Sequence, residues 1–306
     1  EVREANRLAN TPVLKKPITS ELGCVTPVVL VPGNWSLRQL RHQAWNVASM
    51  VVNNASFNCN AAKVLVTSAA WPQREEFLAL LGDTLAQIPP RHAYYPGAES
   101  RHQSFCETHP QVRLCGSGKG ESLPWALATD LDSTSEDSTA FANEAWCGVL
   151  AETPLSEADP SHFLAAATAF CNERLFGTLS CSVILHPNEI RRHRKGYEQA
   201  LTDLRYGSVS VNHWPAISYG LGVTPWGAHP GHTLQDVGSG LGFVHNTRMF
   251  DGIEKCIVEG AFLGPILPPW FANHRLPREL AMALARYEAA PGIRPLLPIL
   301  LHGIRG

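Results

Sequence analysis

The chain has 306 residues, of which 44% are hydrophobic and 17% are charged, a composition that excludes an intrinsically disordered chain and is sufficient for a large core in one or two domains. Lysine and arginine total 25 against 27 aspartate and glutamate, which gives a formal net charge of -2. This balance argues against nucleic acid or anionic lipid as a partner held by overall charge.

Residues 1–90 predict two strand–helix pairs. Short apolar runs at 26–31 and 62–67, the first of them rich in valine, are typical of buried parallel strands. Apolar residues spaced three and four apart predict helices over 37–52 and 71–88. Strand, helix, strand, helix in this order predicts an α/β fold with a mostly parallel sheet in a three-layer arrangement.

The alternation of strands and helices is interrupted after residue 90 and continues from about residue 147. Residues 92–122 are polar and glycine-rich and predict irregular structure. Beyond residue 213 the glycine and proline content rises, which predicts an irregular C-terminal extension with one helix over 279–287 and a proline-broken apolar end. Between these two stretches the sequence predicts strands at 147–151, 179–185 and 207–212 and helices at 163–171 and 190–204.

The start of the chain predicts a piece of a longer protein. Residue 1 is Glu rather than Met, residues 1–9 are typical of a charged helix, and no secretory signal opens the sequence. No run of about 18 apolar residues predicts a membrane span. These features predict a cytoplasmic protein with no membrane partner.

The eight cysteines are expected to be free thiols, because they are spread evenly along a long chain that has no secretory signal and no CxxC motif. The histidines are dispersed, and His229 and His232 flank Pro230-Gly231, where helical ligand spacing does not form. No metal site is therefore expected. The cysteines are Cys24, Cys59, Cys106, Cys115, Cys147, Cys171, Cys181 and Cys256.

Two glycine-rich stretches do not predict a phosphate-binding loop. Residues 116–120, GSGKG, lack the first glycine and the final Ser or Thr of GxxxxGK[ST]. A dinucleotide-binding fingerprint comes directly after a strand, whereas residues 238–242, GSGLG, follow no clear strand. A flexible loop is the better interpretation of both stretches.

Two segments carry candidate chemistry. Residues 16–23, KPITSELG, lead into the strand at 26–31 and contain Glu21, and residues 53–62 form a turn that places Cys59 between a helix and a strand. Backbone N–H groups at such a turn are predicted to favour the thiolate and to bind an oxyanion. Together with a carboxylate that activates water, a thiolate can form and hydrolyse a thioester. From spacing alone, a structural cysteine and a locally paired Glu21 stay open.

Both segments resemble the NAD(P)-dependent aldehyde dehydrogenase family. Residues 19–27 are similar to its E-L-G-G-[KS]-x-P segment, and residues 53–59 to its N-x-G-Q-x-C segment. Three further segments are similar to E-x-F-G-P-V, G-x-V-x-V-N and P-F-G-G of the family: EAWCGV at 144–149, YGSVSVN at 206–212 and PWG at 225–227. All five occur in the family's order, and the resemblance covers about residues 10–240.

The resemblance implies an aldehyde dehydrogenase-like catalytic domain that oxidises an aldehyde to a carboxylic acid. It implies that Cys59 is the nucleophile and that Glu21 is the general base. It also implies that Glu144, Trp146 and Gly23 contact the coenzyme, NAD or NADP. The implied partners are a small-molecule aldehyde and further copies of the chain in a homo-oligomer.

The resemblance also implies a domain organisation, since the family's coenzyme-binding strands would precede the chain. Residues 1–23 are interpreted as a remnant of the coenzyme-binding domain and residues 24–212 as the catalytic domain. Residues 213–306, rich in Gly, Pro and Trp, are interpreted as a bridging or oligomerisation tail. This chain alone is therefore expected to be incomplete.

Departures from the family's motifs indicate a divergent branch. Cys24 replaces a glycine, Ala55-Ser56 replace Gly-Gln, and one extra residue precedes Cys59. Two other classes of function stay open. One is a non-catalytic or truncated module that self-associates through its tail, and the other is a cysteine hydrolase or acyl transferase that pairs Cys59 with a histidine such as His42.

Overall fold

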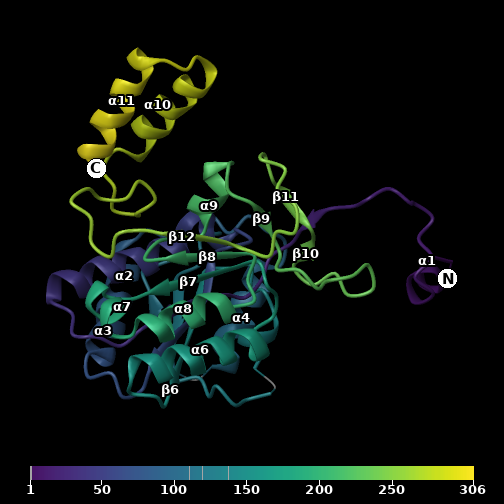
Figure 1. Ribbon diagram of the computed structural model, residues 1–306. Coiled ribbons are helices and arrows are strands. Elements are labelled where there is room, and N and C mark those ends of the chain that lie inside the picture. The colour runs from purple at the N-terminus through teal and green to yellow at the C-terminus, as the bar shows by residue number, and fades with distance from the viewer. Residues whose placement is uncertain (1, 110, 119, 137) are drawn as a thin grey trace.

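The computed structural model describes residues 2–109, 111–118, 120–136 and 138–306, so Lys119 of the first glycine-rich stretch lies outside the described residues. Its central sheet has eight strands in the order β12-β8-β7-β2-β3-β6-β5-β4. Strands β12, β8 and β7 of this sheet lie side by side in Figure 1. Every neighbouring pair is parallel except β4 with β5. The strands are β2 (Thr26–Leu30), β3 (Ala62–Ser68), β4 (Val112–Cys115), β5 (Trp125–Ala128), β6 (Val149–Leu155), β7 (Ser180–Ile184), β8 (Ser208–Val211) and β12 (Cys256–Glu259).

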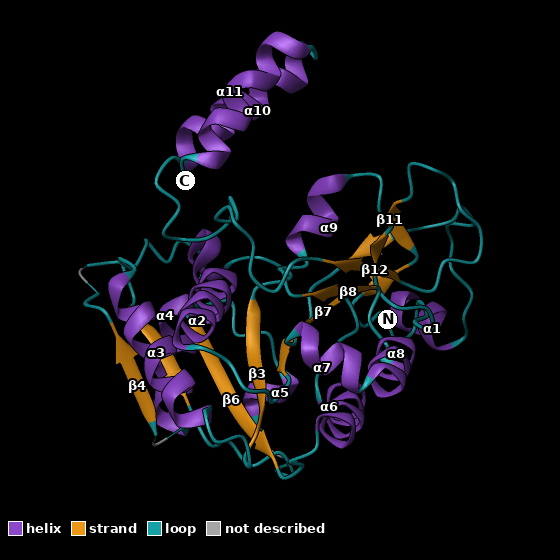
Figure 2. Cartoon of the chain, turned by 60° about the vertical axis from the view of Figure 1, so that its left-hand side comes forward, coloured by secondary structure: helices purple, strands orange, loops and turns teal. Residues whose placement is uncertain are grey.

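Helices cover both faces of this sheet, which confirms the three-layer α/β prediction (Figure 2). One core joins Val28 and Leu30 of β2 to α2 (Leu37–Val52) and α3 (Arg74–Gln87). The other joins Val29 of β2 to α4 (Ala98–Thr108), α6 (Pro160–Arg174) and α8 (Arg194–Asp203). Because alternate residues of a strand point to opposite faces, a strand buried on both sides has to be a continuous apolar run.

Local sequence explains where the helices begin. Ser36 caps α2, and its side chain and that of Gln39 bond reciprocally to each other's backbone N–H groups. Asp159 caps α6 by accepting from two backbone N–H groups, and Pro160 occupies the first turn, where its missing N–H is not needed. The bounds of α2 coincide with the predicted helix at 37–52.

Several expectations for the middle of the chain were wrong. The stretch at 92–122 contains α4 and β4, and β5 was not predicted. The helix predicted over 190–204 is two helices, α7 (Pro187–Arg192) and α8, because His193 between them is not helical (φ -117°, ψ 31°). Short helical segments also occur at α1 (Val2–Leu8), η1 (Asn53–Ser56), α5 (Thr139–Ala142) and α9 (Ala216–Leu221).

The C-terminal extension is not irregular as predicted. It supplies β12 to the central sheet, so the sheet extends beyond residue 212. It also supplies β9 (Trp226–Gly227), which pairs with β11 (Phe243–His245), and β10 (Gly240–Leu241), which pairs with β1 (Ser20–Glu21). Segments near the two ends of the chain therefore meet at β1 and β10.

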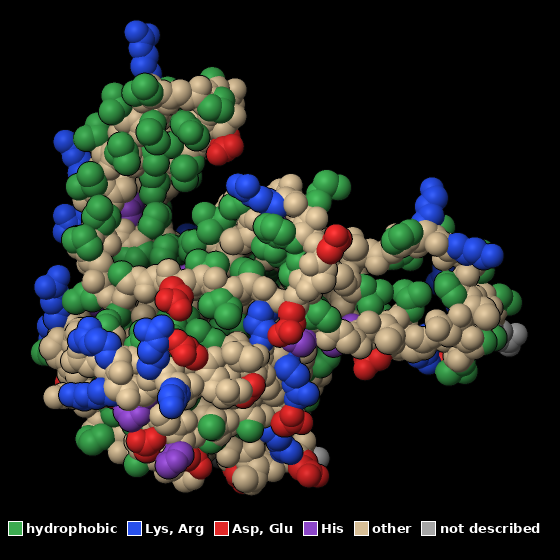
Figure 3. Space-filling model, viewed as in Figure 1, with side chains coloured by type: hydrophobic (Ala, Val, Ile, Leu, Met, Phe, Trp, Pro, Cys, Tyr) green, Lys and Arg blue, Asp and Glu red, His purple; other side chains and the backbone are tan. Residues whose placement is uncertain are grey.

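A helical hairpin, α10 (Pro277–Ala289) and α11 (Ile293–Ile304), stands away from the body of the molecule (Figures 1 and 2). Helix α11 continues through Pro298 and buries none of its residues. Hydrophobic side chains cover the visible face of the hairpin (Figure 3). Six hydrophobic side chains of α11 are between 38% and 81% exposed: Ile293, Leu296, Leu297, Leu300, Leu301 and Ile304. Among the described residues, no helix is both long and apolar enough to cross a membrane.

Candidate active site

The predicted site residues gather at the amino ends of neighbouring parallel strands. Glu21 and Gly23 precede β2, Cys59 precedes β3, and Glu144 precedes β6. Strands β2, β3 and β6 are adjacent in the sheet, so the segments that enter them lie at one edge. The carboxylates of Glu21 and Glu144 both raise the pKa of the Cys59 thiol, and Glu21 also raises the pKa of Glu144. The fold thus joins residues that are more than a hundred positions apart.

A strained turn presents Cys59. After α2 ends at Val52, three consecutive non-glycine residues adopt left-handed backbone angles: Asn54 (φ 51°), Ala55 (φ 54°) and Ser56 (φ 69°). Each such residue costs roughly 1–2 kcal/mol, and such strain persists only where the surrounding structure holds it. The half-buried Cys59 follows and packs on the small cluster of Cys24, Leu179 and Trp226.

The expectation of a stabilised Cys59 thiolate was wrong for this chain. Burial raises the pKa of the Cys59 thiol well above its ordinary value, and the Glu21 carboxylate beside it raises that pKa further. Cys24 and Glu144 also raise the pKa of the thiol, and within the part of the chain that the structure describes no cation lowers it. The thiol is therefore protonated at neutral pH, with a carboxylate next to it.

Neutralising Glu21 is expected to make Cys59 more reactive toward alkylation. In the Glu21→Gln variant the pKa of Cys59 falls, so iodoacetamide modification at pH 8 should speed up by roughly three- to tenfold. Peptide mass spectrometry measures this rate, and Cys106 on α4 serves as an internal control because its neighbouring carboxylate is Glu107. An unchanged Cys59 rate would show that Glu21 does not govern the thiol.

Hydrogen bonds of the backbone fix the segment of Glu21, whereas one oxygen of its carboxylate has no hydrogen-bond partner among the described residues. Strand β1 pairs Glu21 with Gly240, the Leu22 N–H donates to the Ser239 carbonyl (2.9 Å), and the Ser239 hydroxyl donates to the Gly23 carbonyl (2.8 Å). Glu21 Oε1 is buried and has no hydrogen-bond partner among the described residues. A buried, unpartnered carboxylate oxygen is suited to accept a proton from a thiol or a water.

Gly23 allows the carboxylate of Glu144 to lie against the backbone. A β-carbon at residue 23 would fall only 1.8 Å from Glu144 Oε1, so a larger residue would displace this carboxylate. Burial raises the pKa of Glu144 to about 7, with the nearby Lys63 ammonium lowering it and Glu21 raising it. Glu144 therefore changes its charge near neutral pH.

The raised pKa of Glu144 predicts a pH-dependent stability. A carboxyl group with a higher pKa in the folded state stabilises fully below its unfolded value, and this contribution is lost as the pH rises toward about 7. The Glu144→Gln variant should match the parent chain at about pH 4, below the ordinary pKa of a glutamate, and exceed it at pH 7.5. Since the carboxylate is partly exposed, we expect a gain on the order of 1–2 kcal/mol.

Urea unfolding at the two pH values checks this expectation for Glu144. The Glu198→Gln variant, at an exposed carboxylate on α8, is the matched control and should give the same difference at both pH values. A constant difference between Glu144→Gln and the parent chain would contradict the assignment.

Trp146 lies on the same segment as Glu144 and has a left-handed backbone (φ 42°). Its ring stacks on Tyr95 with 5.3 Å between centroids, and Tyr95 stacks on Phe57 with 4.4 Å between centroids. Arg101 donates to the Trp146 carbonyl (3.1 Å) and to the Ala145 carbonyl (2.8 Å). The stack thus links the Cys59 turn to the segment that carries Glu144.

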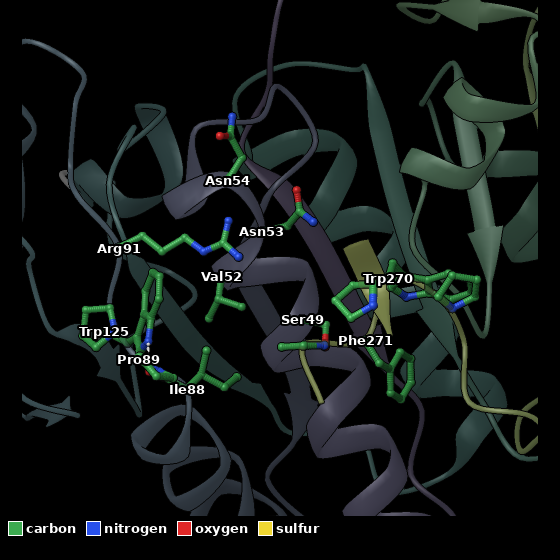
Figure 4. A pocket seen from close by; sticks show the side chains of 14 residues that line it. Ser49, Val52, Asn53, Asn54, Ile88, Pro89, Arg91, Trp125, Trp270 and Phe271 are labelled. Atoms are coloured by element: carbon green, nitrogen blue, oxygen red, sulfur yellow. Dashed lines mark hydrogen bonds between the residues drawn. The ribbon is translucent and has the colours of Figure 1, made fainter. Parts of the chain in front are cut away.

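Two features near the candidate site, a buried lysine and a cavity, were not predicted from the sequence. Lys63 is a buried cation between the Cys59 turn and the Glu144 segment, and the signal for it was a lysine within the apolar run at 62–67. A cavity of about 340 Å³ reaches the start of the Cys59 turn from the side of α2. The side chains of Asn53, Arg91 and Trp270 surround this cavity (Figure 4).

The other cysteines and candidate ligands form no further centre. All eight cysteines are free, and Cys147, Cys171 and Cys181 are buried. Within the described ranges, no group of three or more His, Cys, Asp or Glu side chains is placed to hold a metal ion. Burial raises the pKa of Cys24 to about 11 and that of Cys147 to about 11, so these thiols stay protonated at neutral pH.

The fold matches solved aldehyde dehydrogenase structures. The NAD-dependent aldehyde dehydrogenase from Sinorhizobium meliloti superposes with a TM-score of 0.60 and 18% identity over 83% of this chain and 48% of its own. The chain has an aldehyde dehydrogenase-like fold. The Mycobacterium tuberculosis aldehyde dehydrogenase complexed with NAD+ matches with a TM-score of 0.57 and 19% identity over 79% of this chain and 47% of its own.

A third similar structure is the NADP-dependent glyceraldehyde-3-phosphate dehydrogenase from Bacillus halodurans C-125 complexed with NADP. It has a TM-score of 0.58 and 16% identity over 79% of this chain and 47% of its own. The chain therefore spans about half the length of the solved structures that it matches. No protein-family model and no curated protein matches the sequence. The aldehyde dehydrogenase-like fold is thus shown by structural similarity, while the sequence identity to these structures is only 16% to 19%.

Proposed function

We propose that the protein to which this chain belongs oxidises an aldehyde to a carboxylic acid with NAD or NADP. One observation supports this most strongly. In an aldehyde dehydrogenase-like fold, the Cys59 thiol lies beside the carboxylate of Glu21, whose buried Oε1 has no hydrogen-bond partner among the described residues, with Glu144 on the neighbouring segment. The three residues occupy the positions at which the sequence resembles the family's nucleophile, base and coenzyme contact.

The residues around Glu144 fit a nicotinamide coenzyme. The carboxylate of Glu144 is half-buried, and a carboxylate accepts hydrogen bonds from ribose hydroxyls. Trp146 offers an aromatic ring on the same segment, and the missing side chain of Gly23 leaves room for the Glu144 carboxylate beside the backbone. When bound, the coenzyme accepts the hydride that leaves the substrate carbon. We propose Glu144, Trp146 and Gly23 as its contacts in this half of the protein.

The chain's own residues divide the proton transfers. The S–H of Cys59 adds across the aldehyde carbonyl: the sulfur bonds to the carbon and the proton goes to the oxygen, which gives a thiohemiacetal. The hydride leaves the carbon and the hydroxyl proton goes to solvent, so that a thioester remains. The Glu21 carboxylate then takes a proton from water, the resulting hydroxide attacks the thioester, and Glu21 returns the proton to the departing Cys59 sulfur. The carboxylic acid is released and the Cys59 sulfur is restored.

A covalent-trapping experiment tests this proposal. The full protein, with the coenzyme-binding region restored, is mixed with a set of aldehydes and with NAD or NADP. Absorbance reports the reduced nucleotide, and mass spectrometry after rapid acid quench locates the acyl group. We expect reduced nucleotide and an acyl group on Cys59. Acylation of another residue, or neither signal with any aldehyde, would contradict the proposal.

One alternative keeps structural support, namely a non-catalytic module that self-associates. The six exposed Ile and Leu side chains of α11 suit a contact with a further copy. Failure to bind either nucleotide by calorimetry, together with association in solution, would favour it. The cysteine hydrolase alternative is weaker, because the His42 ring packs on Phe271 (5.0 Å between centroids) and no histidine acts on the Cys59 thiol.

The remaining expectations belong to the same proposal. We propose a cytoplasmic homo-oligomer with no nucleic-acid or membrane partner. We also propose that residues 1–23 continue a coenzyme-binding domain, that residues 24–212 form the catalytic domain, and that residues 213–306 serve as a bridging or oligomerisation segment. Analytical ultracentrifugation of the full protein measures the oligomeric state.

A further inference from the structure

Lys63 is a charged residue in the interior of the sheet. It is the second residue of β3, its neighbours along the strand are apolar, and only 6% of it is exposed. Burial lowers the pKa of Lys63 to about 8, so the ammonium is still charged at pH 7. Burying an ammonium group costs much free energy unless its N–H groups are hydrogen-bonded, so the acceptors around Lys63 are what allow it to be buried.

The Lys63 ammonium bonds to two segments of the candidate active site. Its Nζ donates to the Ser56 hydroxyl (2.6 Å), to the Ser56 carbonyl (3.2 Å) and to the Cys147 carbonyl (3.0 Å). Ser56 is the last residue of the left-handed turn before Cys59, and Cys147 follows Glu144 by three residues. One buried side chain therefore joins the segment with the nucleophile to the segment with the coenzyme carboxylate.

The turn needs such a partner because of its backbone. Three consecutive non-glycine residues in left-handed conformations are strained, and without surrounding contacts the chain would relax. Ser56 is fully buried, and two of the three Lys63 bonds end on it. The geometry of Lys63 is suited to hold this end of the turn.

The same ammonium faces Glu144. A cation near a carboxylate favours its charged form, so Lys63 opposes the rise that burial and Glu21 impose on the pKa of Glu144. Lys63 and Glu144 also line one cavity of about 380 Å³ together with Arg101. The titratable and charged groups around Glu144 are Lys63 on β3, Glu21 on β1, Arg101 on α4, and the thiols of Cys24 and Cys59.

We propose that Lys63 is a positioning residue that holds the Cys59 turn in its strained conformation and keeps Glu144 available as an anion. The proposal rests on the proposed function for the roles of Cys59 and Glu144. The link that Lys63 makes between the two segments is tested by hydrogen exchange and by the pH dependence of stability, and neither measurement needs catalytic activity.

The matched control is Lys255, a second lysine whose Nζ donates three hydrogen bonds. Its acceptors are the carbonyls of Leu201, Thr202 and Leu204, its side chain is 9% exposed, and its Nζ also lies 3.2 Å from Oε1 of the exposed Glu254. The Lys255→Met variant removes a comparable set of bonds at the end of α8, away from the candidate site. The Lys63→Arg variant keeps a cation with several donors at the original position.

Hydrogen exchange measures the mechanical part. In Lys63→Met, the amides of residues 53–60 should exchange at least about tenfold faster than in the parent chain. Lys255→Met should leave them unchanged, and Lys63→Arg should recover most of the protection. Ser56→Ala removes one of the three acceptors and should give an intermediate rate, which provides a second test should Lys63→Met fold poorly. Unchanged protection in both Lys63→Met and Ser56→Ala would overturn the proposal.

The pH dependence measures the electrostatic part. The midpoint at which Glu144 ionises is read from the pH-dependent stability difference between each lysine variant and its double variant with Glu144→Gln. Lys63→Met should move this midpoint upward by about one pH unit, whereas Lys255→Met should not move it. A stationary midpoint would overturn the electrostatic link. Faster exchange of residues 53–60 and a shifted Glu144 midpoint in Lys63→Met, found in a protein that oxidises no aldehyde, would contradict only the proposed function.

Discussion

The Cys59→Ala variant of the full protein is expected to lose aldehyde oxidation by at least about 10³-fold, since the proposed reaction proceeds through a bond to the Cys59 sulfur. The alanine removes the sulfur and leaves the rest of the cluster of Cys24, Leu179 and Trp226 in place. Stability should change little, because Cys59 is only partly buried. Steady-state production of the reduced nucleotide measures the loss.

Two companion variants make this expectation specific. Cys106→Ala, at a partly exposed cysteine on α4, should keep full activity. Glu21→Gln should spare the first turnover and slow the following ones, because it removes the proposed base for thioester hydrolysis but not the sulfur. Rapid mixing would then show a burst of reduced nucleotide. Retained oxidation in Cys59→Ala, or an unchanged steady state in Glu21→Gln, would contradict the assigned roles.

The largest loss of stability is expected at Glu152, which has no exposed surface. Glu152 Oε2 accepts from Arg74 Nη2 (2.7 Å) and from the Asp130 N–H (3.0 Å), while Oε1 accepts from Arg74 Nε (3.0 Å) and from the Thr67 hydroxyl. This network joins β3, β6 and α3 near the carboxyl ends of the strands. Glu152→Gln removes the fully buried carboxylate and leaves the guanidinium of Arg74 with the more exposed carboxylates of Asp130 and Glu75, so it should cost about 3 kcal/mol.

Urea unfolding measures the effect at Glu152, with Glu75→Gln as the matched control. Glu75 bonds to the same guanidinium (2.6 Å), but its side chain is 82% exposed, so its loss should cost less than about 1 kcal/mol. The double replacement Arg74→Met with Glu152→Leu should recover much of the lost stability, since it removes both charges together. Equal effects of Glu152→Gln and Glu75→Gln would refute the buried-pair interpretation.

The Cys59 site shows how far local reasoning reaches. The positions of Glu21, Cys59 and Glu144 just before buried strands were predictable, because valine-rich runs mark those strands. Their meeting at one edge depends on β2, β3 and β6 being neighbours, which is a property of strand order. The direction of the Cys59 pKa shift was predicted wrongly, because it depends first on burial of the thiol and then on the carboxylates that strand order brings close to it.

The C-terminal segment shows the opposite limit. Strand β12 is a short, half-exposed edge strand, so its apolar signal is weak, and only its pairing with β8 defines it. Helix α11 contains Pro298, which local rules count against a helix, yet the helix is continuous. The hairpin contact between α10 and α11 supplies the stabilisation that local preference does not.

The sequence by itself determined the layered α/β architecture, the helix caps and the location of the candidate chemistry, because each depends on neighbouring residues and their periodicity. The tertiary structure decided which of those residues act on one another. Lys63 reaches Ser56 and Cys147, and Gly23 admits Glu144, only because separate strands are adjacent. Charges and close contacts between distant segments follow from strand order, and no local pattern encodes that order.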